Sequence, residues 1–235
     1  MSAPPSQSDL ALIVGASRGL GLGLAREYAK RGWRVIGTVR DANKPTGLCA
    51  LADEGGGQVQ IETVDINLPE QVTALRKSLD GRKIDLLFVN AGVSNGAIET
   101  VPGSSIEQFQ RLLITNAWSP IRVIETMHDL VPPSGVIAAM SSGLGSVTNN
   151  TRGGWEIYRA SKAALNTMLR SFAARSGAGR TVLAVVPGWV RTDMGGPSAT
   201  LDIETSVNGM VEMIAARRGM LGAAYVDYQG NDVPW

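Results

Sequence analysis

The sequence predicts an α/β fold in which helices cover both faces of a seven-stranded parallel sheet. Short apolar runs alternate with segments of helical spacing along the chain. Several runs are continuously apolar, which is typical of strands buried on both faces. Such alternation produces a doubly wound sheet with right-handed crossovers. Because 44% of the 235 residues are apolar and no linker interrupts the composition, we expect one domain.

The seven expected strands are the apolar runs themselves. They span residues 10–14, 34–39, 59–64, 84–89, 135–140, 181–186 and 223–228. Helical spacing marks the stretches between them, such as 22–29 and 72–79, and about six helices are expected. The segment 1–9 has no apolar pattern and is expected to be a disordered lead-in to a domain over 10–235.

Composition excludes several classes of function. A net charge of +1 gives no basis for binding nucleic acid or an anionic membrane. No apolar stretch reaches the roughly 18 residues of a membrane span, and the N-terminus lacks the pattern of a signal peptide. Cys49 is the only cysteine, which favours a reducing, cytoplasmic location. With His128 as the only histidine, a structural zinc site and a histidine-rich catalytic metal site are excluded. A magnesium site held by carboxylates stays open, but no clustered carboxylates indicate one, so chemistry without a metal is expected.

Glycine and polar residues follow six of the expected strands. The segments are GASRG, RD, DIN, NAG, SSG and PGWVRTD, in chain order. In open parallel sheets, ligands bind beyond the carboxyl ends of the strands. The six segments are therefore expected to meet at one edge of the sheet and to form the functional site.

The first of these segments, GASRGLG (15–21), has two interpretations. As G-x-S-x-G it matches the turn that carries the nucleophile of a serine hydrolase. Such an enzyme needs a histidine base, normally far downstream in the chain. His128 lies on a helical stretch in mid-chain, where a surface or helix-end histidine is the ordinary expectation. The hydrolase interpretation is therefore disfavoured.

As a glycine-rich turn, the same segment binds the pyrophosphate of a dinucleotide. Gly15 makes the tight turn, while Gly19 and Gly21 allow the backbone to approach the phosphates. The helix that begins near Gly19 offers free N–H groups and a partial positive charge. Ser17 is then a hydroxyl that faces phosphate, and not a nucleophile.

Tyr158 and Lys162 form a second group of candidate functional residues. They are four residues apart on a predicted helix and therefore share one face. A nearby ammonium lowers the pKa of a phenol from its usual value near 10. A tyrosine tuned in this way can donate a proton to a carbonyl oxygen and recover it. The pair predicts general acid–base chemistry.

Together these motifs resemble the short-chain dehydrogenase/reductase family. The resemblance extends from residue 10 to the C-terminus and includes GASRGLG, NAG (90–92), Asn116, Ser142, YRASK (158–162) and PGWVRTDM (187–194). It implies a Rossmann fold. SSGLGS, YRASKAALN, PGWVRTDMGGP and DYQGNDVPW make the chain most similar to the C-factor and sniffer-like carbonyl reductases.

The resemblance implies a role for each catalytic position. Tyr158 is the acid/base, and Lys162 binds the nicotinamide ribose and lowers the pKa of the tyrosine. Ser142 hydrogen-bonds the substrate carbonyl, in preference to its neighbour Ser141 or to Ser146. Asn116 helps to hold a water for proton relay. Between Ser142 and Tyr158 the chain is longer than is common in the family, so the segment TNNTRGGW is expected to lengthen the loop beside the substrate.

The expected cofactor is NADPH, with NADH less favoured. Enzymes that use NAD place an acidic residue after the second strand, whereas a basic residue accepts the 2′-phosphate of NADP. Here Thr38 and Val39 are followed by Arg40, Arg18 is within reach, and Asp41 is expected in a turn or helix cap. The family implies further cofactor contacts from Leu20, Asp65, Ile66, Asn90, Ala91, Gly92, Pro187, Gly188, Val190 and Thr192.

The implied reaction is the reduction of a ketone or aldehyde to an alcohol by hydride transfer, with Tyr158 as proton donor. Expected pocket walls are Val93, Leu144, Val147, Trp155, Trp189 and Met194, which indicate a mostly apolar small-molecule substrate. The stretch 195–202 resembles a mobile lid. The alternative function is an NADP(H)-binding regulatory or signalling protein on the same fold. Family members commonly pair through the tyrosine helix and the helix before it, so a homodimer is expected, with 109–127 supplying apolar area.

Overall fold

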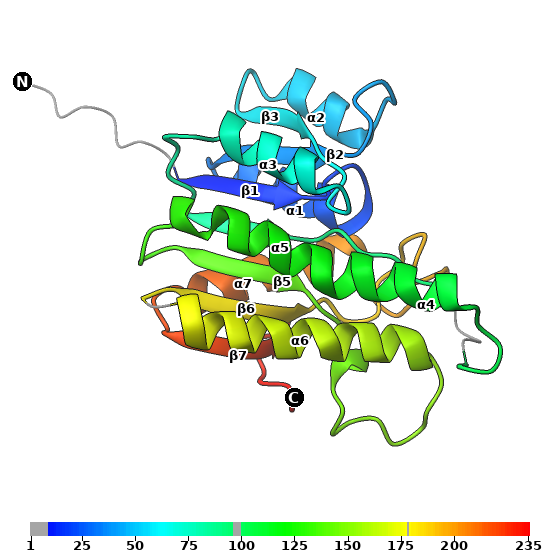
Figure 1. Ribbon diagram of the computed structural model, residues 1–235. Coiled ribbons are helices and arrows are strands. Elements are labelled where there is room, and N and C mark those ends of the chain that lie inside the picture. Colours follow the sequence, from blue (N-terminus) through cyan, green and yellow to red (C-terminus); the bar gives the residue numbers. More distant parts are fainter. Residues whose placement is uncertain (1–8, 96–99, 178) are drawn as a thin grey trace, which may run out of the picture.

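A computed structural model describes residues 9–95, 100–177 and 179–235 and contains one seven-stranded parallel sheet between two layers of helices (Figure 1). The strand order is β3-β2-β1-β4-β5-β6-β7. The strands are β1 (Leu10–Val14), β2 (Arg34–Val39), β3 (Val59–Thr63), β4 (Leu86–Val89), β5 (Val136–Met140), β6 (Thr181–Val186) and β7 (Gly222–Asp227). The predicted fold class is confirmed.

Helices α1 (Gly19–Lys30), α2 (Gly47–Glu54) and α7 (Ile203–Arg217) cover one face of the sheet, and α3 (Pro69–Ser78), α5 (Ser119–Met127) and α6 (Glu156–Ser176) cover the other. Helix α4 (Ile106–Leu113) runs through a π-helical turn into α5. The described residues thus form seven α-helices, one more than about six expected.

Both faces of β1 are buried, which explains its continuous apolar sequence. Leu10, Leu12 and Val14 pack into the core under α3, α5 and α6, while Ala11 and Ile13 pack under α1, α2 and α7. All five residues are at most 2% exposed. Burial of apolar surface on both sides is the main source of stability for such a sheet.

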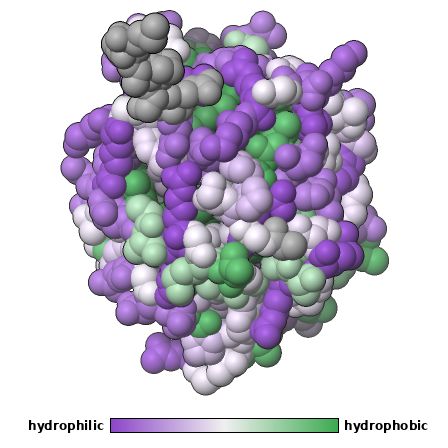
Figure 2. Space-filling view, turned by 90° about the vertical axis from the view of Figure 1, so that its left-hand side faces the viewer, coloured by the Kyte–Doolittle hydropathy of each residue, from purple (hydrophilic) through white to green (hydrophobic). Residues whose placement is uncertain are grey.

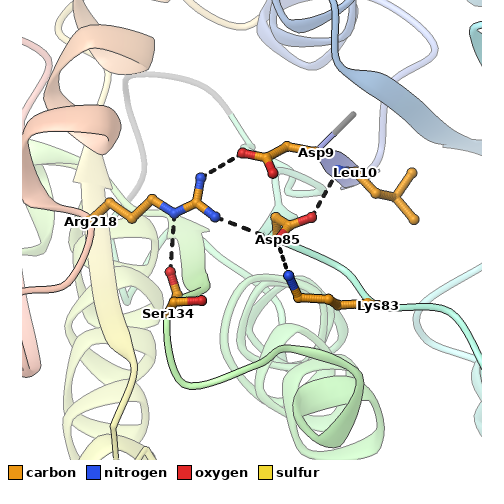
Figure 3. A network of polar contacts seen from close by, with 6 residues as sticks. All are labelled: Asp9, Leu10, Lys83, Asp85, Ser134 and Arg218. Atoms are coloured by element: carbon orange, nitrogen blue, oxygen red, sulfur yellow. Dashed lines mark hydrogen bonds and ion pairs between the residues drawn. The ribbon is translucent and has the colours of Figure 1, made fainter. Parts of the chain in front are cut away.

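A polar network joins the amino ends of the strands (Figure 3). Its members are Asp9, Leu10, Lys83, Asp85, Ser134 and Arg218. The buried carboxylate of Asp85 accepts a hydrogen bond from the backbone N–H of Leu10 at 3.1 Å and lies 3.4 Å from the guanidinium of Arg218. Strand β4 begins at Leu86, two residues later than predicted, although the backbone of Asp85 still bonds to Leu10 and Val136 of the adjacent strands.

Asp9 was expected in the disordered lead-in, but it is part of this network. Its carboxylate pairs with Arg218 at 2.6 Å. The rest of that segment, 1–8, lies outside the described residues. Hydrophilic side chains cover most of the molecular face at the amino ends of the strands (Figure 2). None of the helices in the described ranges is long and apolar enough to cross a membrane.

Candidate active site

A cleft of about 1390 Å³ lies at the carboxyl ends of the strands. Residues that follow β1 to β6 all line it, so the six predicted segments meet at one edge of the sheet. Its volume exceeds the roughly 300–1,000 Å³ of an ordinary small-molecule pocket. The expected cofactor residues that line it are Gly15, Ser17, Arg18, Gly19, Leu20, Arg40, Asp65, Ile66, Asn90, Ala91, Gly92, Pro187, Gly188, Val190 and Thr192.

The glycine turn after β1 is held by side chains of two other strand ends. Gly15 has a φ of +90°, and a Cβ there would lie 2.9 Å from the backbone nitrogen of Ala91. The N–H of Gly15 donates to Thr38 Oγ1 at 3.0 Å, and Asn90 Nδ2 donates to the carbonyl of Gly15 at 2.7 Å. Sequence reasoning missed this role of Thr38 because it assigned the residue only to cofactor selection.

Helix α1 begins directly after this turn, and its first two residues, Gly19 and Leu20, line the cleft. No side chain caps its N-terminus, and uncapped N–H groups attract anions. Gly21 does not line the cleft, contrary to the expectation that it approaches the phosphates. A Cβ at Gly21 would lie 2.1 Å from the carbonyl oxygen of Gly15, so this glycine allows α1 to pack against the turn.

Two arginines lie at the cleft end that follows β1 and β2. Arg40 is exposed there, and Arg18 pairs with Asp193 at 3.4 Å across the cleft mouth. Both partners of that pair are more than 70% exposed, so it contributes little to stability. The carboxylate of Asp41 accepts from the backbone N–H of Asn43 at 3.0 Å, which is the turn geometry predicted for it.

Tyr158 and Lys162 lie together on the buried face of α6 and line the cleft. Lys162 Nζ is 5.9 Å from the centre of the Tyr158 ring and donates to the carbonyl oxygen of Met140 at 2.8 Å. The lysine is only 3% exposed, and its burial lowers the pKa of the ammonium to about 8. The ammonium of Lys162 is therefore easier to deprotonate than that of an exposed lysine.

The three candidate serines differ in their hydrogen bonds. Ser141 and Ser142 both line the cleft, and the Ser142 hydroxyl oxygen accepts a long bond, 3.2 Å, from the N–H of Leu144. Ser141 donates its hydroxyl to Asn166 Oδ1 at 2.7 Å. Ser146 is buried outside the cleft lining. The geometry favours Ser142 over the other two.

Asn116 is completely buried in the π-helical turn Ile114–Trp118 and does not line the cleft. Its Oδ1 accepts from the N–H of Val93 at 2.8 Å, and its Nδ2 donates to the carbonyl of Val93 and to Ser161 Oγ. The side chain therefore fixes the segment after β4 against α6. Single π turns of this kind are frequent at functional sites.

Most of the expected substrate pocket is present as a small apolar cluster around Tyr158. Val93, Leu144 and Trp155 pack there, and the Trp155 ring meets the Tyr158 ring at 5.8 Å. Trp189 and Met194 also line the cleft, where both are about half exposed. Val147 was wrongly expected in this wall; it is 72% exposed and borders a second, smaller groove behind α6.

Two further features of the cleft were not predicted. Arg111 lines it one helical turn before Thr115, a spacing that could have indicated a shared face. Trp155 has a φ of 54° and follows Gly153 and Gly154, which also have positive φ. Three left-handed residues in a row are a local constraint that aims the Trp155 ring at the pocket.

His128 lies at the C-terminal end of α5, where its Nδ1 is 2.9 Å from the carbonyl oxygen of Glu125. Helix α5 runs antiparallel to the strands, so this end is at the amino edge of the sheet (Figure 1). His128 does not line the cleft that contains Ser17. A serine–histidine pair is therefore not formed, and the hydrolase interpretation has no support.

Comparisons with known proteins agree with these motifs. A family model described as Enoyl-(Acyl carrier protein) reductase matches residues 15–222. C-signal of Myxococcus xanthus is 38% identical over 155 residues, which are 65% of this chain and 93% of that relative. A short-chain dehydrogenase/reductase structure from Burkholderia multivorans with bound NADP has a TM-score of 0.94 and 49% identity, covering 97% of this chain and 100% of that chain.

A carbonyl reductase from Pseudomonas aeruginosa PAO1 in complex with NADP is also similar. The TM-score is 0.90 and the identity 38%, over 97% of this chain and 100% of that chain. The family model extends over most of the chain, and each of the two structures covers 97% of it. The chain therefore belongs to the short-chain dehydrogenase/reductase family of oxidoreductases, as its motifs predicted.

Proposed function

We propose that the protein is a cytoplasmic, NADPH-dependent reductase that converts a ketone or aldehyde to an alcohol, with Tyr158 as the proton donor. The observation that carries the proposal is the buried pair of Tyr158 and Lys162 on one face of α6, which lines the same cleft as Ser142. A phenol, an ammonium and a hydroxyl at one apolar pocket are suited to protonating a carbonyl oxygen.

The residues present fit a dinucleotide. The close approach of Gly15 and Gly21 leaves no room for side chains, and the uncapped start of α1 offers N–H groups to phosphate. The cleft also has room for a second, smaller molecule. Two structural neighbours contain bound NADP, which supports the same cofactor here.

Preference for NADPH is supported by the residues after β2. Thr38 and Val39 are buried and carry no charge. Arg40, the next residue, is exposed and is the first charged residue after β2 that lines the cleft. Arginine can bind a phosphate with two parallel hydrogen bonds. Arg18 would join it after releasing Asp193, an exposed partner that it can exchange at small cost.

When bound, NADPH would supply the hydride that reduces the carbonyl carbon. Tyr158 would donate its phenolic proton to the carbonyl oxygen, and Ser142 would hydrogen-bond that oxygen. Lys162 would bind the nicotinamide ribose and stabilise the phenolate through its positive charge. Asn116 would maintain the backbone geometry that holds a relay water. Val93, Leu144, Trp155, Trp189 and Met194 favour an apolar substrate.

The test is the oxidation of NADPH, followed by absorbance, with aromatic and aliphatic ketones and aldehydes. Wild type is compared with Tyr158→Phe, which retains the ring. We expect turnover by wild type and a loss of roughly 10²–10⁴-fold in the variant, with unchanged binding of NADPH. Turnover that survives in Tyr158→Phe would contradict the assigned proton donor.

A regulatory or signalling function is the second candidate, because C-signal is among the similar proteins. It requires nucleotide binding but no turnover. Binding of NADPH without oxidation, across the whole panel of carbonyl compounds, would favour this alternative.

We also propose that two copies associate through α4, α5 and α6. Ile106, Phe109 and Trp118 are between 46% and 69% exposed along the continuous helical segment of α4, the π-helical turn and α5. Met168 is 38% exposed on α6. Sedimentation velocity should give a dimer for wild type and a monomer for Phe109→Glu. A wild-type monomer at micromolar concentration would refute the pairing.

A further inference from the structure

Tyr225 is a buried tyrosine that the proposed mechanism does not use. It lies on β7, is 2% exposed, and its hydroxyl donates a hydrogen bond to the carbonyl oxygen of Ser142. On β6 its register partner is Ala184, and both side chains belong to the core under α6. The small alanine lets the tyrosine ring cross β6 and reach the end of β5. A residue on the edge strand thereby contacts the backbone of a candidate catalytic residue.

Side chains also hold the groups on either side of Ser142. Lys162 Nζ donates to the carbonyl of Met140, and Ser141 donates its hydroxyl to Asn166 Oδ1. Asn166 Nδ2 lies 3.4 Å from the carbonyl oxygen of Gly145. Burial raises the pKa of Tyr225, although hydrogen bonds with Asn166 and Ser141 lower it in part. The tyrosine is therefore a neutral donor near neutral pH.

The carbonyl oxygen of Ser142 has two donors, the N–H of Gly145 at 2.8 Å and the Tyr225 hydroxyl. The first belongs to the same short turn and moves with it, whereas the second is anchored in the sheet. Trp235 packs against the Tyr225 ring at 5.3 Å, and its backbone oxygen accepts from Thr148. The C-terminal Trp235 therefore packs against the Tyr225 ring and also holds the loop after Ser142.

We propose that Tyr225 is a positioning residue for Ser142: its hydroxyl fixes the backbone of Ser142 so that the serine hydroxyl is aimed at the substrate carbonyl beside Tyr158. This inference rests on the proposed function. Small displacements of a catalytic group are costly, because the bonds it makes in the transition state depend on alignment within about 0.5 Å.

The test is Tyr225→Phe, which removes one oxygen atom and keeps the packing of the ring. We expect kcat for carbonyl reduction to fall about tenfold, with NADPH affinity unchanged. The matched control is Tyr28→Phe, since the Tyr28 hydroxyl is also buried but has no hydrogen-bond partner among the described residues. That control should retain the kcat of wild type.

A double-mutant cycle separates positioning from a general structural effect. If Tyr225 acts through Ser142, adding Tyr225→Phe to Ser142→Ala should leave kcat at the level of Ser142→Ala alone. An equal fall in both backgrounds, or no fall in either, would overturn the proposal.

A crystal structure of Tyr225→Phe provides a readout that does not depend on turnover. We expect the Ser142 hydroxyl to move by more than about 0.5 Å relative to Tyr158. An unmoved serine would overturn the positioning role even if the protein reduces no carbonyl compound. A moved serine in a protein without carbonyl turnover would uphold the contact and refute only the proposed function.

Discussion

Lys162 holds a positive charge in an almost completely buried position, and this has a consequence for stability. Its pKa is lowered from 10.5 to about 8 by burial, which corresponds to roughly 3 kcal/mol. Below about pH 8 both the folded and the unfolded chain hold the proton, so the folded state bears the full cost of burying the charge. As pH rises from about 8 to 10.5, the folded state releases its proton first and the protein gains stability.

Lys162→Met should therefore differ from wild type in a way that depends on pH. Measured by urea unfolding without added nucleotide, the stability of the variant relative to wild type should fall by roughly 2–3 kcal/mol between about pH 7 and pH 10. The variant should also lose carbonyl turnover. A difference that stays constant over this pH range would show that the folded lysine has an ordinary pKa.

The proposed preference for NADPH can be tested at one side chain, Arg40. Arg40→Ala should raise KM for NADPH by roughly 10–100-fold, because a charged hydrogen-bonded contact with the 2′-phosphate is worth about 1.5–3 kcal/mol. KM for NADH should change little, since NADH has no phosphate there. Arg26→Ala is the control, because Arg26 is exposed on α1 away from the cleft. An equal effect on both cofactors would contradict this role.

At the scale of the element, the turn between β1 and α1 depends on Gly21 more than on Gly19. Gly21→Ala puts a methyl group 2.1 Å from the Gly15 carbonyl oxygen, whereas the nearest atom to a Cβ at Gly19 is 3.8 Å away. We expect losses of about 2–3 kcal/mol for Gly21→Ala and about 1 kcal/mol for Gly19→Ala, from its φ of +57°. Urea unfolding of both variants checks this order, and the reverse order would refute it.

Elements that depend on local pattern were predictable from the sequence, and contacts between distant segments were not. The strands β1, β2 and β6 have the predicted bounds because continuous apolar runs have no other stable place than a doubly covered sheet. Tyr158 and Lys162 were predictable because a helix places residues four apart on one face.

The partners of the other site residues come from elsewhere in the chain, which explains what the sequence could not reveal. Ser141 is distinguished from Ser142 by Asn166, 25 residues further along, and Asn116 is bound by Val93 and Ser161. Val147 was misplaced because it lies just beyond a turn whose direction depends on packing against α6. No spacing rule gives these contacts, since each depends on how separate elements pack.

For the whole molecule, the polar network at the amino edge joins the starts of three adjacent strands, β1, β4 and β5, to the end of α7. Arg218, at the end of α7, binds Asp9 before β1, Asp85 before β4 and the carbonyl of Ser134 before β5. The network lies at the amino ends of the strands (Figures 1 and 3), whereas the cleft lies at their carboxyl ends. Changes in the network should therefore affect stability without affecting the kinetics of the folded protein.

Asp85→Ala tests this separation. The substitution leaves the N–H of Leu10 and part of the Arg218 guanidinium without a partner, so we expect a loss of about 2–3 kcal/mol in the free energy of unfolding. Asp80→Ala is the control, since its pair with Arg76 is 79% exposed on the aspartate side and should be worth less than about 1 kcal/mol. The two variants should have equal KM for NADPH at a temperature where both are folded. A weaker nucleotide affinity in Asp85→Ala would mean that the amino edge is coupled to the cleft through the strands.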